Sequence, residues 1–448
     1  MAGILRAGRI RPQRMKILTY RDAGYAAFVR RMRRRALPSD DVRETVAEII
    51  GEVGKRGDAA LIDFAQRFDR VKLCRRRLAV ETEEIERAAS AVSGETRRAV
   101  ARSLRNIEAF ARRGMRKDWT RRNAEGAEVG ERFVPFDRVG VYVPGGKAPL
   151  VSTALMTAGF AKAAGVPEIV AATPCGPDGA IVPELLYALR EAGATEVWRI
   201  GGAQAIAAMA LGTRRIAPVD RIFGPGNRYV VEAKRQLVGA VSIDLLPGPS
   251  EVLVVADKTA EARFIAADML AQAEHGGDSA VGFLTDSKAL LNRVVKEIER
   301  QLKELSRARI IRDVLKRGTF LVQVADMEEA VRLTNDFAPE HLSLVVAEED
   351  RWLPQIKTAG AIYAGALSAV AVGDFLAGPS HTLPTGGAGR SFSGLRADQF
   401  QRRTSIVRMD AAAVRKSLPV VAEFARIEGL DAHGRSVELR AAGKSLRG

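Results

Sequence analysis

The chain is 448 residues long, with 47% hydrophobic and 28% charged residues, as expected for a globular protein of two or three domains. No stretch approaches eighteen uninterrupted apolar residues, so we expect neither a transmembrane helix nor a membrane partner. The two cysteines, Cys74 and Cys175, exclude a disulfide framework and favour a reducing, cytoplasmic location.

Positive charge is concentrated near the amino terminus. Residues 1–130 carry 31 Lys and Arg against 18 Asp and Glu, which is +13 of the net charge of +16. The run of arginines between Arg30 and Arg35 has neither interleaved aromatics nor an accompanying nucleic-acid-binding motif. We therefore interpret residues 1–38 as a solvated basic arm and expect no nucleic-acid partner. A basic protein that binds nucleic acid is the alternative.

Residues 39–112 are expected to be mainly helical. Ser39, followed by Asp40 and Asp41, has the pattern of a helix N-cap with an acidic first turn. Apolar residues then recur at helical spacing, first from Val42 to Val53 and again from residue 93 to residue 112. This segment therefore predicts several helices, each with one buried face.

From residue 138 onward, short apolar strands alternate with helices. Strands are predicted at 139–143, 168–172, 196–200 and 221–223, each followed by a turn containing Gly or Pro and then a helix. This alternation predicts an open parallel sheet, whose carboxyl edge is a common place for nucleotides. The turn from Gly224 to Tyr229 lacks the third glycine of a dinucleotide fingerprint, so ordinary tight turns are an equal interpretation.

A second stretch of alternating strands and helices follows. Its strands are predicted at 251–256, 280–285, 319–324, 342–346 and 361–363. After Gln399 the pattern predicts a last strand at 404–409 and a helix at 412–427. The chain is therefore assigned to the α/β class, with a helical N-terminal segment and a small C-terminal α/β tail.

Histidines are few, and none occurs in the first 274 residues. Gln272 and His275 are three residues apart at the end of a predicted helix, so their side chains share one face. Their oxygen and nitrogen donors suit a borderline divalent cation, which the partial negative charge of a helix C-terminus also favours. A solvated helix face is the alternative for this pair.

The remaining histidines lie near acidic residues. Glu340 and His341 provide a carboxylate and an imidazole, which are the groups that general acid–base catalysis needs. Asp374, beside a glycine, offers an oxygen ligand on a loop. Alone, each of these residues also fits an ordinary surface or turn position. Together with the pair described above, they suggest a ligand set closest to the zinc repertoire: Gln272, His275, Asp374 and His433.

Eight segments, in this order, resemble the histidinol dehydrogenase family. They are RVGVYVPGG (138–146), GGAQAI (201–206), FGPGN (223–227), GPSEVL (248–253), QAEHG (272–276), PEHL (339–342), HTLPTGG (381–387) and EGLDAH (428–433). The order and spacing hold from about Val42 to Arg440. Eight motifs in sequence are far more specific than any one of them.

The resemblance implies an enzyme that uses zinc and NAD to oxidise L-histidinol through the aldehyde to L-histidine, reducing two NAD. His341 would remove the alcohol proton and Glu340 would activate water. The implied zinc ligands are Gln272, His275, Asp374 and His433. The implied substrate contacts are Ser250, Gln272, His275, His341, Asp374, His381, Glu428 and His433, and the implied NAD contacts are Tyr142, Gln204 and Asn227.

The resemblance also implies two Rossmann-like open-sheet domains. Residues 39–141 and 251–393 would form one discontinuous domain with the metal and acid–base residues, and residues 142–250 an inserted NAD domain. Residues 394–448 would be exchanged between the subunits of a homodimer with shared active sites. Glu428 and His433 would then act across the interface, so that all four histidines serve one site.

Two alternatives within enzyme chemistry stay open. Related dehydrogenases oxidise other small alcohols, and the choice of substrate here depends mainly on His381 and Glu428. Cys175, in a Pro-Cys-Gly-Pro loop at the end of a predicted strand, has the position of a nucleophile that could form a thiohemiacetal.

Overall fold

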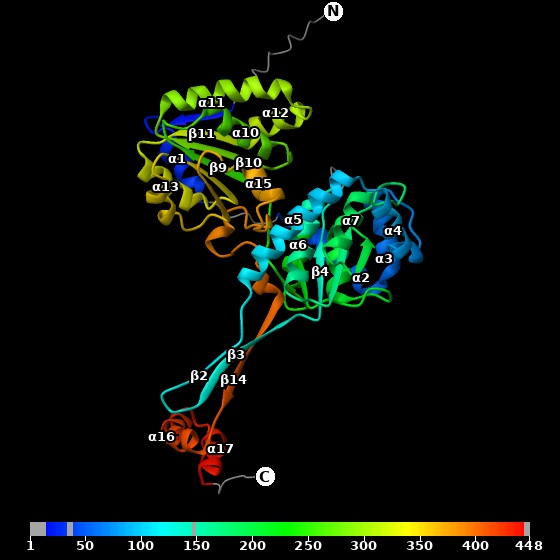
Figure 1. Ribbon diagram of the computed structural model, residues 1–448, viewed down its shortest axis with the longest axis vertical. Coiled ribbons are helices and arrows are strands. Elements are labelled where there is room, and N and C mark those ends of the chain that lie inside the picture. The colour runs from blue at the N-terminus through cyan, green and yellow to red at the C-terminus, as the bar shows by residue number, and fades with distance from the viewer. Residues whose placement is uncertain (1–14, 34–38, 146–148, 443–448) are drawn as a thin grey trace, which may run out of the picture.

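The computed structural model describes residues 15–33, 39–145 and 149–442. The backbone forms two parallel sheets, each flanked by helices, and a three-stranded antiparallel ribbon (Figure 1). The predicted α/β class with two Rossmann-like sheet domains is therefore confirmed. Within the described ranges, no helix combines the length and the apolar character needed to cross a membrane.

The larger sheet has six parallel strands in the order β1-β11-β10-β9-β12-β13. Its strands are β1 (Lys16–Thr19), β9 (Glu251–Ala256), β10 (Ala280–Thr285), β11 (Thr319–Gln323), β12 (His341–Val345) and β13 (Ala361–Ala364). Its helices are α1 (Tyr25–Met32), α10 (Ala262–Ala273), α11 (Lys288–Gln301), α12 (Ala308–Arg317), α13 (Met327–Phe337), α14 (Glu349–Trp352) and α15 (Val370–Phe375). Alternate residues of β9 face opposite cores, with Val252 and Val254 on one side and Leu253 and Val255 on the other. This strand is thus buried on both faces, as a central parallel strand should be.

The smaller sheet has five parallel strands in the order β6-β5-β4-β7-β8. Its strands are β4 (Arg138–Tyr142), β5 (Glu168–Thr173), β6 (Glu196–Arg199), β7 (Arg221–Phe223) and β8 (Ser242–Ile243). Four helices connect them: α6 (Val151–Ala163), α7 (Pro183–Glu191), α8 (Gly202–Leu211) and α9 (Arg228–Leu237). The predicted alternation of strands and helices is therefore present, with each Gly-rich turn at a carboxyl strand end.

The amino-terminal helices cover this smaller sheet, not the larger one. They are α2 (Asp40–Arg56), α3 (Asp58–Phe64), α4 (Thr82–Ala91) and α5 (Gly94–Gly114). α2 packs on α8 and α9, α4 on α7, and α5 on α6, and Val42 and Val46 share a core with Tyr142 and Val170. The prediction that residues 39–141 join residues 251–393 is therefore wrong. The apolar faces of these helices bury the smaller sheet, and their periodicity predicts a buried face but not its partner.

The described part of the predicted basic arm is also folded. β1 is an edge strand that pairs with β11, and α1 packs Phe28 against Phe320 with ring centroids 5.4 Å apart. Residues 15–33 therefore belong to the six-stranded sheet, and the expectation of a solvated arm is wrong for them. Residues 1–14 and 34–38 lie outside the described residues.

A long ribbon joins two distant parts of the chain. β3 (Glu128–Pro135) pairs antiparallel with β2 (Trp119–Arg122) and with β14 (Gln401–Arg408). The ribbon projects from the two sheet units and carries α16 (Ala411–Glu428) and α17 (Asp431–Ala442) at its far end (Figure 1). We call residues 401–442 the C-terminal arm. The predicted last strand and helix are found in it, displaced by a few residues at their ends.

Candidate active site

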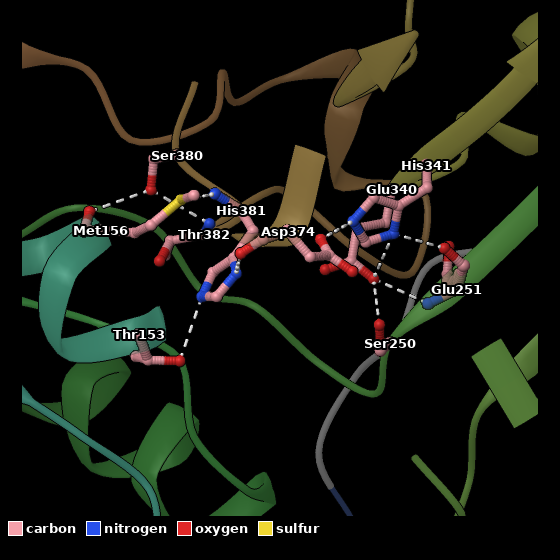
Figure 2. A network of polar contacts seen from close by, with 10 residues as sticks. All are labelled: Thr153, Met156, Ser250, Glu251, Glu340, His341, Asp374, Ser380, His381 and Thr382. Atoms are coloured by element: carbon pink, nitrogen blue, oxygen red, sulfur yellow. Dashed lines mark hydrogen bonds and ion pairs between the residues drawn. The ribbon is translucent and has the colours of Figure 1, made fainter. Parts of the chain in front are cut away.

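The predicted acid–base residues and three of the four predicted metal ligands gather at the amino edge of the six-stranded sheet. His341 is the first residue of β12, and the neighbouring β9 begins at Glu251. α10 returns from the carboxyl end of β9 to this edge, so its last turn brings Gln272 to the same place. α15 carries Asp374. Figure 2 shows Glu340, His341 and Asp374 pointing toward one another.

Glu340 is a buried carboxyl group with fixed partners. Its Oε2 accepts hydrogen bonds from Ser250 Oγ and from the backbone N–H of Glu251, each at 2.7 Å (Figure 2). Burial raises the pKa of Glu340 to about 7, although His341 and the two hydrogen bonds act in the opposite direction. The group therefore changes protonation near neutral pH, which suits a general base.

His341 has one ring nitrogen occupied and the other directed at the cluster. Nδ1 lies 2.9 Å from the carbonyl oxygen of Glu251, and because a carbonyl only accepts, Nδ1 carries a hydrogen. Nε2 is buried without a hydrogen-bond partner and lies 3.5 Å from Asp374 Oδ1. Burial lowers the pKa of His341, but the charges of Glu340 and Asp374 outweigh it and raise the pKa to about 9.

Asp374 lies among three imidazoles. Its backbone carbonyl accepts a hydrogen bond from His381 Nδ1 at 3.1 Å, and His381 Nε2 accepts one from Thr153 Oγ1 at 3.0 Å. Burial would raise the pKa of the Asp374 carboxyl group, but His341, His381 and His275 hold it below its ordinary value. Burial lowers the pKa of His381. An ionised carboxylate beside several imidazoles is an environment in which a divalent cation binds.

Gln272 and His275 stand next to this group at the end of α10. Gln272 is buried, and its Nε2 has no hydrogen-bond partner. Desolvation by the surrounding protein lowers the pKa of His275, whereas the charge of Asp374 acts in the opposite direction. An unsatisfied buried amide indicates a missing partner, so this corner fits a ligand. Among the described residues, no three His, Cys, Asp or Glu side chains are arranged to hold a metal ion.

Glu428 and His433 lie elsewhere. Glu428 ends α16 and His433 is in the first turn of α17, and both are exposed at the far end of the C-terminal arm (Figure 1). Three of the four histidines therefore surround Asp374, and His433 does not. Within one chain, the ribbon carries His433 away from both sheets, so the expectation that all four histidines serve one site requires a second subunit and stays a prediction.

The three predicted cofactor contacts follow the carboxyl edge of the five-stranded sheet. Tyr142 ends β4, Gln204 lies in the first turn of α8 after β6, and Asn227 caps α9 after β7. The Tyr142 hydroxyl accepts a hydrogen bond from the Gly202 N–H at 3.0 Å, and burial raises its pKa to about 12. Asn227 Oδ1 accepts from two N–H groups in the first turn of α9. This edge, with its helix N-termini, suits a ligand that carries phosphates.

Two residues that the sequence did not single out connect the site. Glu251 joins the two acid–base residues through its backbone, and its Oε1 accepts a hydrogen bond from Gly386 N–H at 2.8 Å. Thr153, on α6, reaches from the five-stranded unit to His381. An acidic residue at the start of an apolar strand was a usable signal for Glu251, whereas no pattern marks Thr153.

A cavity of about 840 Å³ opens beside the cluster. Its lining includes Gly373, next to Asp374, and Tyr363, whose ring centroid lies 6.1 Å from that of His341. Its walls also expose apolar side chains, such as Leu367. The volume is in the range of small-molecule sites, and the apolar walls indicate a surface suited to further contact.

Comparison with known proteins shows the family to which the chain belongs. A family model described as histidinol dehydrogenase matches residues 32–441. The histidinol dehydrogenase of a Synechococcus strain is 45% identical over 398 residues, covering 88% of this chain and 91% of the relative. That of Xylella fastidiosa (strain Temecula1) is 44% identical over 430 residues, covering 95% and 99%.

A solved structure supports the same relationship. The crystal structure of histidinol dehydrogenase from Elizabethkingia anophelis matches with a TM-score of 0.90 and 33% identity. The match covers 95% of this chain and 98% of that chain. The chain therefore belongs to the histidinol dehydrogenase family, oxidoreductases that catalyse the final steps of histidine biosynthesis.

Proposed function

We propose that this enzyme oxidises L-histidinol through histidinaldehyde to L-histidine and reduces two NAD. The observation that carries the proposal is the buried pair of Glu340 and His341 beside Asp374. Burial and neighbouring charge bring the pKa of the carboxyl group to about 7 and that of the imidazole to about 9. A buried carboxyl group that titrates near neutral pH, beside a buried imidazole, suits two successive oxidations, each of which releases protons.

His341 would act as the base in the first oxidation. Its Nε2 takes the proton of the substrate hydroxyl while a hydride leaves the same carbon for the nicotinamide ring. The Glu251 carbonyl holds the hydrogen on Nδ1, so Nε2 is the accepting atom. Asp374 raises the pKa of His341. A cation held by Asp374 would offset that charge and favour the neutral imidazole.

Glu340 would act in the second oxidation. Its carboxylate takes a proton from water as the oxygen adds to the aldehyde carbon, and the hydrated aldehyde then gives its hydride to the second NAD. Ser250 and the Glu251 N–H both bind Oε2, which leaves Oε1 to face the water. Ser250 would also contact the substrate, as would His381, whose ring Thr153 orients.

The proposed zinc ligands are Gln272, His275 and Asp374, with His433 of the partner subunit. The lowered pKa of Asp374, whose carboxylate lies among His341, His381 and His275, supports this assignment. Bound zinc would hold the amine and imidazole of the substrate in place, which is a templating role. Glu428 of the partner subunit would accept the far N–H of that imidazole.

The shared site requires a homodimer in which the C-terminal arm of one chain reaches the other. Val420, Phe424 and Ile427 on α16 are 57%, 59% and 62% exposed, which leaves an apolar face without cover. The apolar walls of the cavity beside Asp374 offer a matching surface. We propose that neither a nucleic acid nor a membrane takes part, and that the enzyme works in the cytoplasm.

NAD is proposed to bind along the carboxyl edge of the five-stranded sheet, at Tyr142, Gln204 and Asn227. Residues 142–250, together with the rest of β4 and with α2–α5, would form the NAD-binding unit. Residues 251–393, together with β1 and α1, would form the unit with the metal and acid–base groups. The Thr153 contact with His381 links the two units where cofactor and substrate would meet.

The stoichiometry of NADH tests the proposal. The zinc-loaded protein should form two NADH per L-histidinol, lose activity with a chelator and regain it with zinc. No NADH from the zinc-loaded protein would overturn the function. Faster turnover of another amino alcohol in a panel, unchanged in a Glu428→Gln variant, would assign a different substrate. A Cys175→Ser variant should keep full activity, because no step uses a thiol.

A further inference from the structure

Two opposite charges are fully buried in the five-stranded unit, and the proposed chemistry does not use them. Lys234 lies on the inner face of α9 and Asp244 follows β8, and both side chains are 0% exposed. They form an ion pair with each other. Burying two charges is costly, so such a pair needs additional partners to be tolerated.

The backbone of Gly224 provides a hydrogen-bond partner for each of the two side chains. Lys234 Nζ donates to the Gly224 carbonyl at 2.9 Å, and the Gly224 N–H donates to Asp244 Oδ2 at 2.7 Å. Asp244 Oδ1 also accepts from the Leu245 N–H at 2.6 Å. The ion pair therefore binds both backbone polar groups of Gly224. Lys234 binds the carbonyl oxygen, and Asp244 binds the N–H.

Gly224 is held in a conformation that only glycine adopts easily. Its φ is +114°, and a Cβ atom there would collide with the backbone carbonyl of Tyr142. The residue thus lies directly against the last residue of β4. The buried pair fixes this close approach, because it restrains the N–H and the C=O of Gly224 at the same time.

The position of Gly224 sets the geometry of the proposed cofactor edge. It opens the turn that leads through Gly226 to Asn227, the cap of α9. It also abuts Tyr142, whose hydroxyl is bonded to the backbone two residues before Gln204. Each of the three proposed NAD contacts is therefore linked to Gly224. Asn227 is linked through the turn, and Tyr142 and Gln204 are linked through the end of β4.

We infer that Lys234 and Asp244 are positioning residues for NAD, which hold the turn from Gly224 to Asn227 in the shape that the cofactor requires. The inference rests on the proposed function, because it takes the NAD contacts from it. A pair that served folding alone would change stability and leave the affinity of the folded enzyme for NAD unchanged. The two roles are therefore separable by measuring affinity and stability on the same variants.

The main test neutralises both members of the pair together, so that no single buried charge is left without a partner. In the zinc-loaded, full-length enzyme, Lys234→Met with Asp244→Asn should raise the Kd of NAD and its KM at least about tenfold. Isothermal titration gives the Kd. The kcat at saturating NAD and the KM for L-histidinol should stay within about twofold, because the acid–base cluster lies on the other sheet.

A matched control removes a second ion pair from the same sheet. Arg138 begins β4 and bonds to Glu196, which begins β6, so this pair lies at the opposite, amino edge. Arg138→Met with Glu196→Gln should lower the melting temperature and leave the Kd of NAD within about twofold of the wild type. An equal loss of NAD affinity in this control would show a general effect of instability and overturn the inference.

A conservative pair of substitutions completes the series. Lys234→Gln with Asp244→Asn keeps a donor for the Gly224 carbonyl, so the Kd of NAD should rise only about threefold. If the Lys234→Met, Asp244→Asn variant does not fold, the conservative variant is the test. A Kd of NAD equal to that of the wild type would then overturn the inference. A wild-type enzyme that does not bind NAD would instead contradict the proposed function.

Discussion

The acid–base cluster and the C-terminal arm differ in how firmly a single chain positions their proposed functional residues. Glu340 and His341 are buried, and the start of β9 fixes an atom of each through hydrogen bonds. Glu428 and His433, which the same family motifs mark, are exposed at the end of the ribbon. One half of the proposed site is therefore preorganised within the chain, and the other half depends on a second chain.

Removing the proposed base should have the largest effect on the preorganised half. We expect His341→Asn to lower kcat for L-histidinol by about 10²- to 10⁴-fold, because no other group lies at the position of Nε2. Zinc content, measured by atomic emission, and the Kd of NAD should be unchanged. A variant that retained a tenth of the wild-type kcat would contradict the role of His341 as base.

Mixing two inactive variants tests the half that needs another chain. In a shared site, a heterodimer of His341→Asn and His433→Ala chains has one intact site, built from the unmodified residue of each. Random exchange of subunits should therefore restore about one quarter of wild-type activity. Each variant alone should stay inactive. If the mixture also stays inactive while native mass spectrometry shows heterodimers, the arm does not complete the partner's site.

The pKa of Glu340 predicts a pH dependence of the second oxidation. Because burial raises this pKa to about 7, the carboxyl group is mainly protonated below pH 6 and cannot take a proton from water. With histidinaldehyde as substrate, kcat should rise with pH through about 7 and then level off. In Glu340→Gln the rate should be low and without this rise. A wild-type profile that falls between pH 6 and 8 would exclude Glu340 as the base.

The smallest effect is expected from charges on the ribbon. Arg403 on β14 and Glu131 on β3 are diagonal neighbours that form an ion pair at 2.8 Å, but Arg403 is largely exposed. Arg403→Ala should therefore lower the free energy of unfolding by less than about 1 kcal/mol. Chemical denaturation measures this, and the change should shrink further in high salt. A much larger loss would mean that the ribbon is stabilised mainly by charge.

Most strands of the two sheets were predictable because buried parallel strands are apolar runs between Gly-rich turns, but the edge strands β1 and β8 were not predicted. The partner of the helices in residues 39–112 was not, since periodicity shows that a face is buried but not what covers it. β2 was missed because it is short, charged and exposed, and β3 because its charged residues interrupt the apolar alternation of a half-buried strand.

The residues of the site also divide into those that the sequence could predict and those that it could not. The family resemblance assigned Glu340, His341 and Asp374 to one site in advance, and the structure places His341 beside both carboxyl groups. The buried charges of Lys234 and Asp244 carry no such signal, because a lysine in a helix ordinarily faces solvent. The path of the chain from β3 to β14, which decides where Glu428 and His433 lie, depends on pairing between residues too distant for any local pattern to predict.

The ribbon also fixes the order in which the molecule can mature. An ion pair at its base joins Asp137 and Arg402, which are 265 residues apart in sequence. During synthesis, β3 leaves the ribosome long before β14 exists, so the arm is among the last parts of the chain to fold. If the arm completes the partner's site, a nascent or truncated chain has no activity, and catalysis begins only when two finished chains have met.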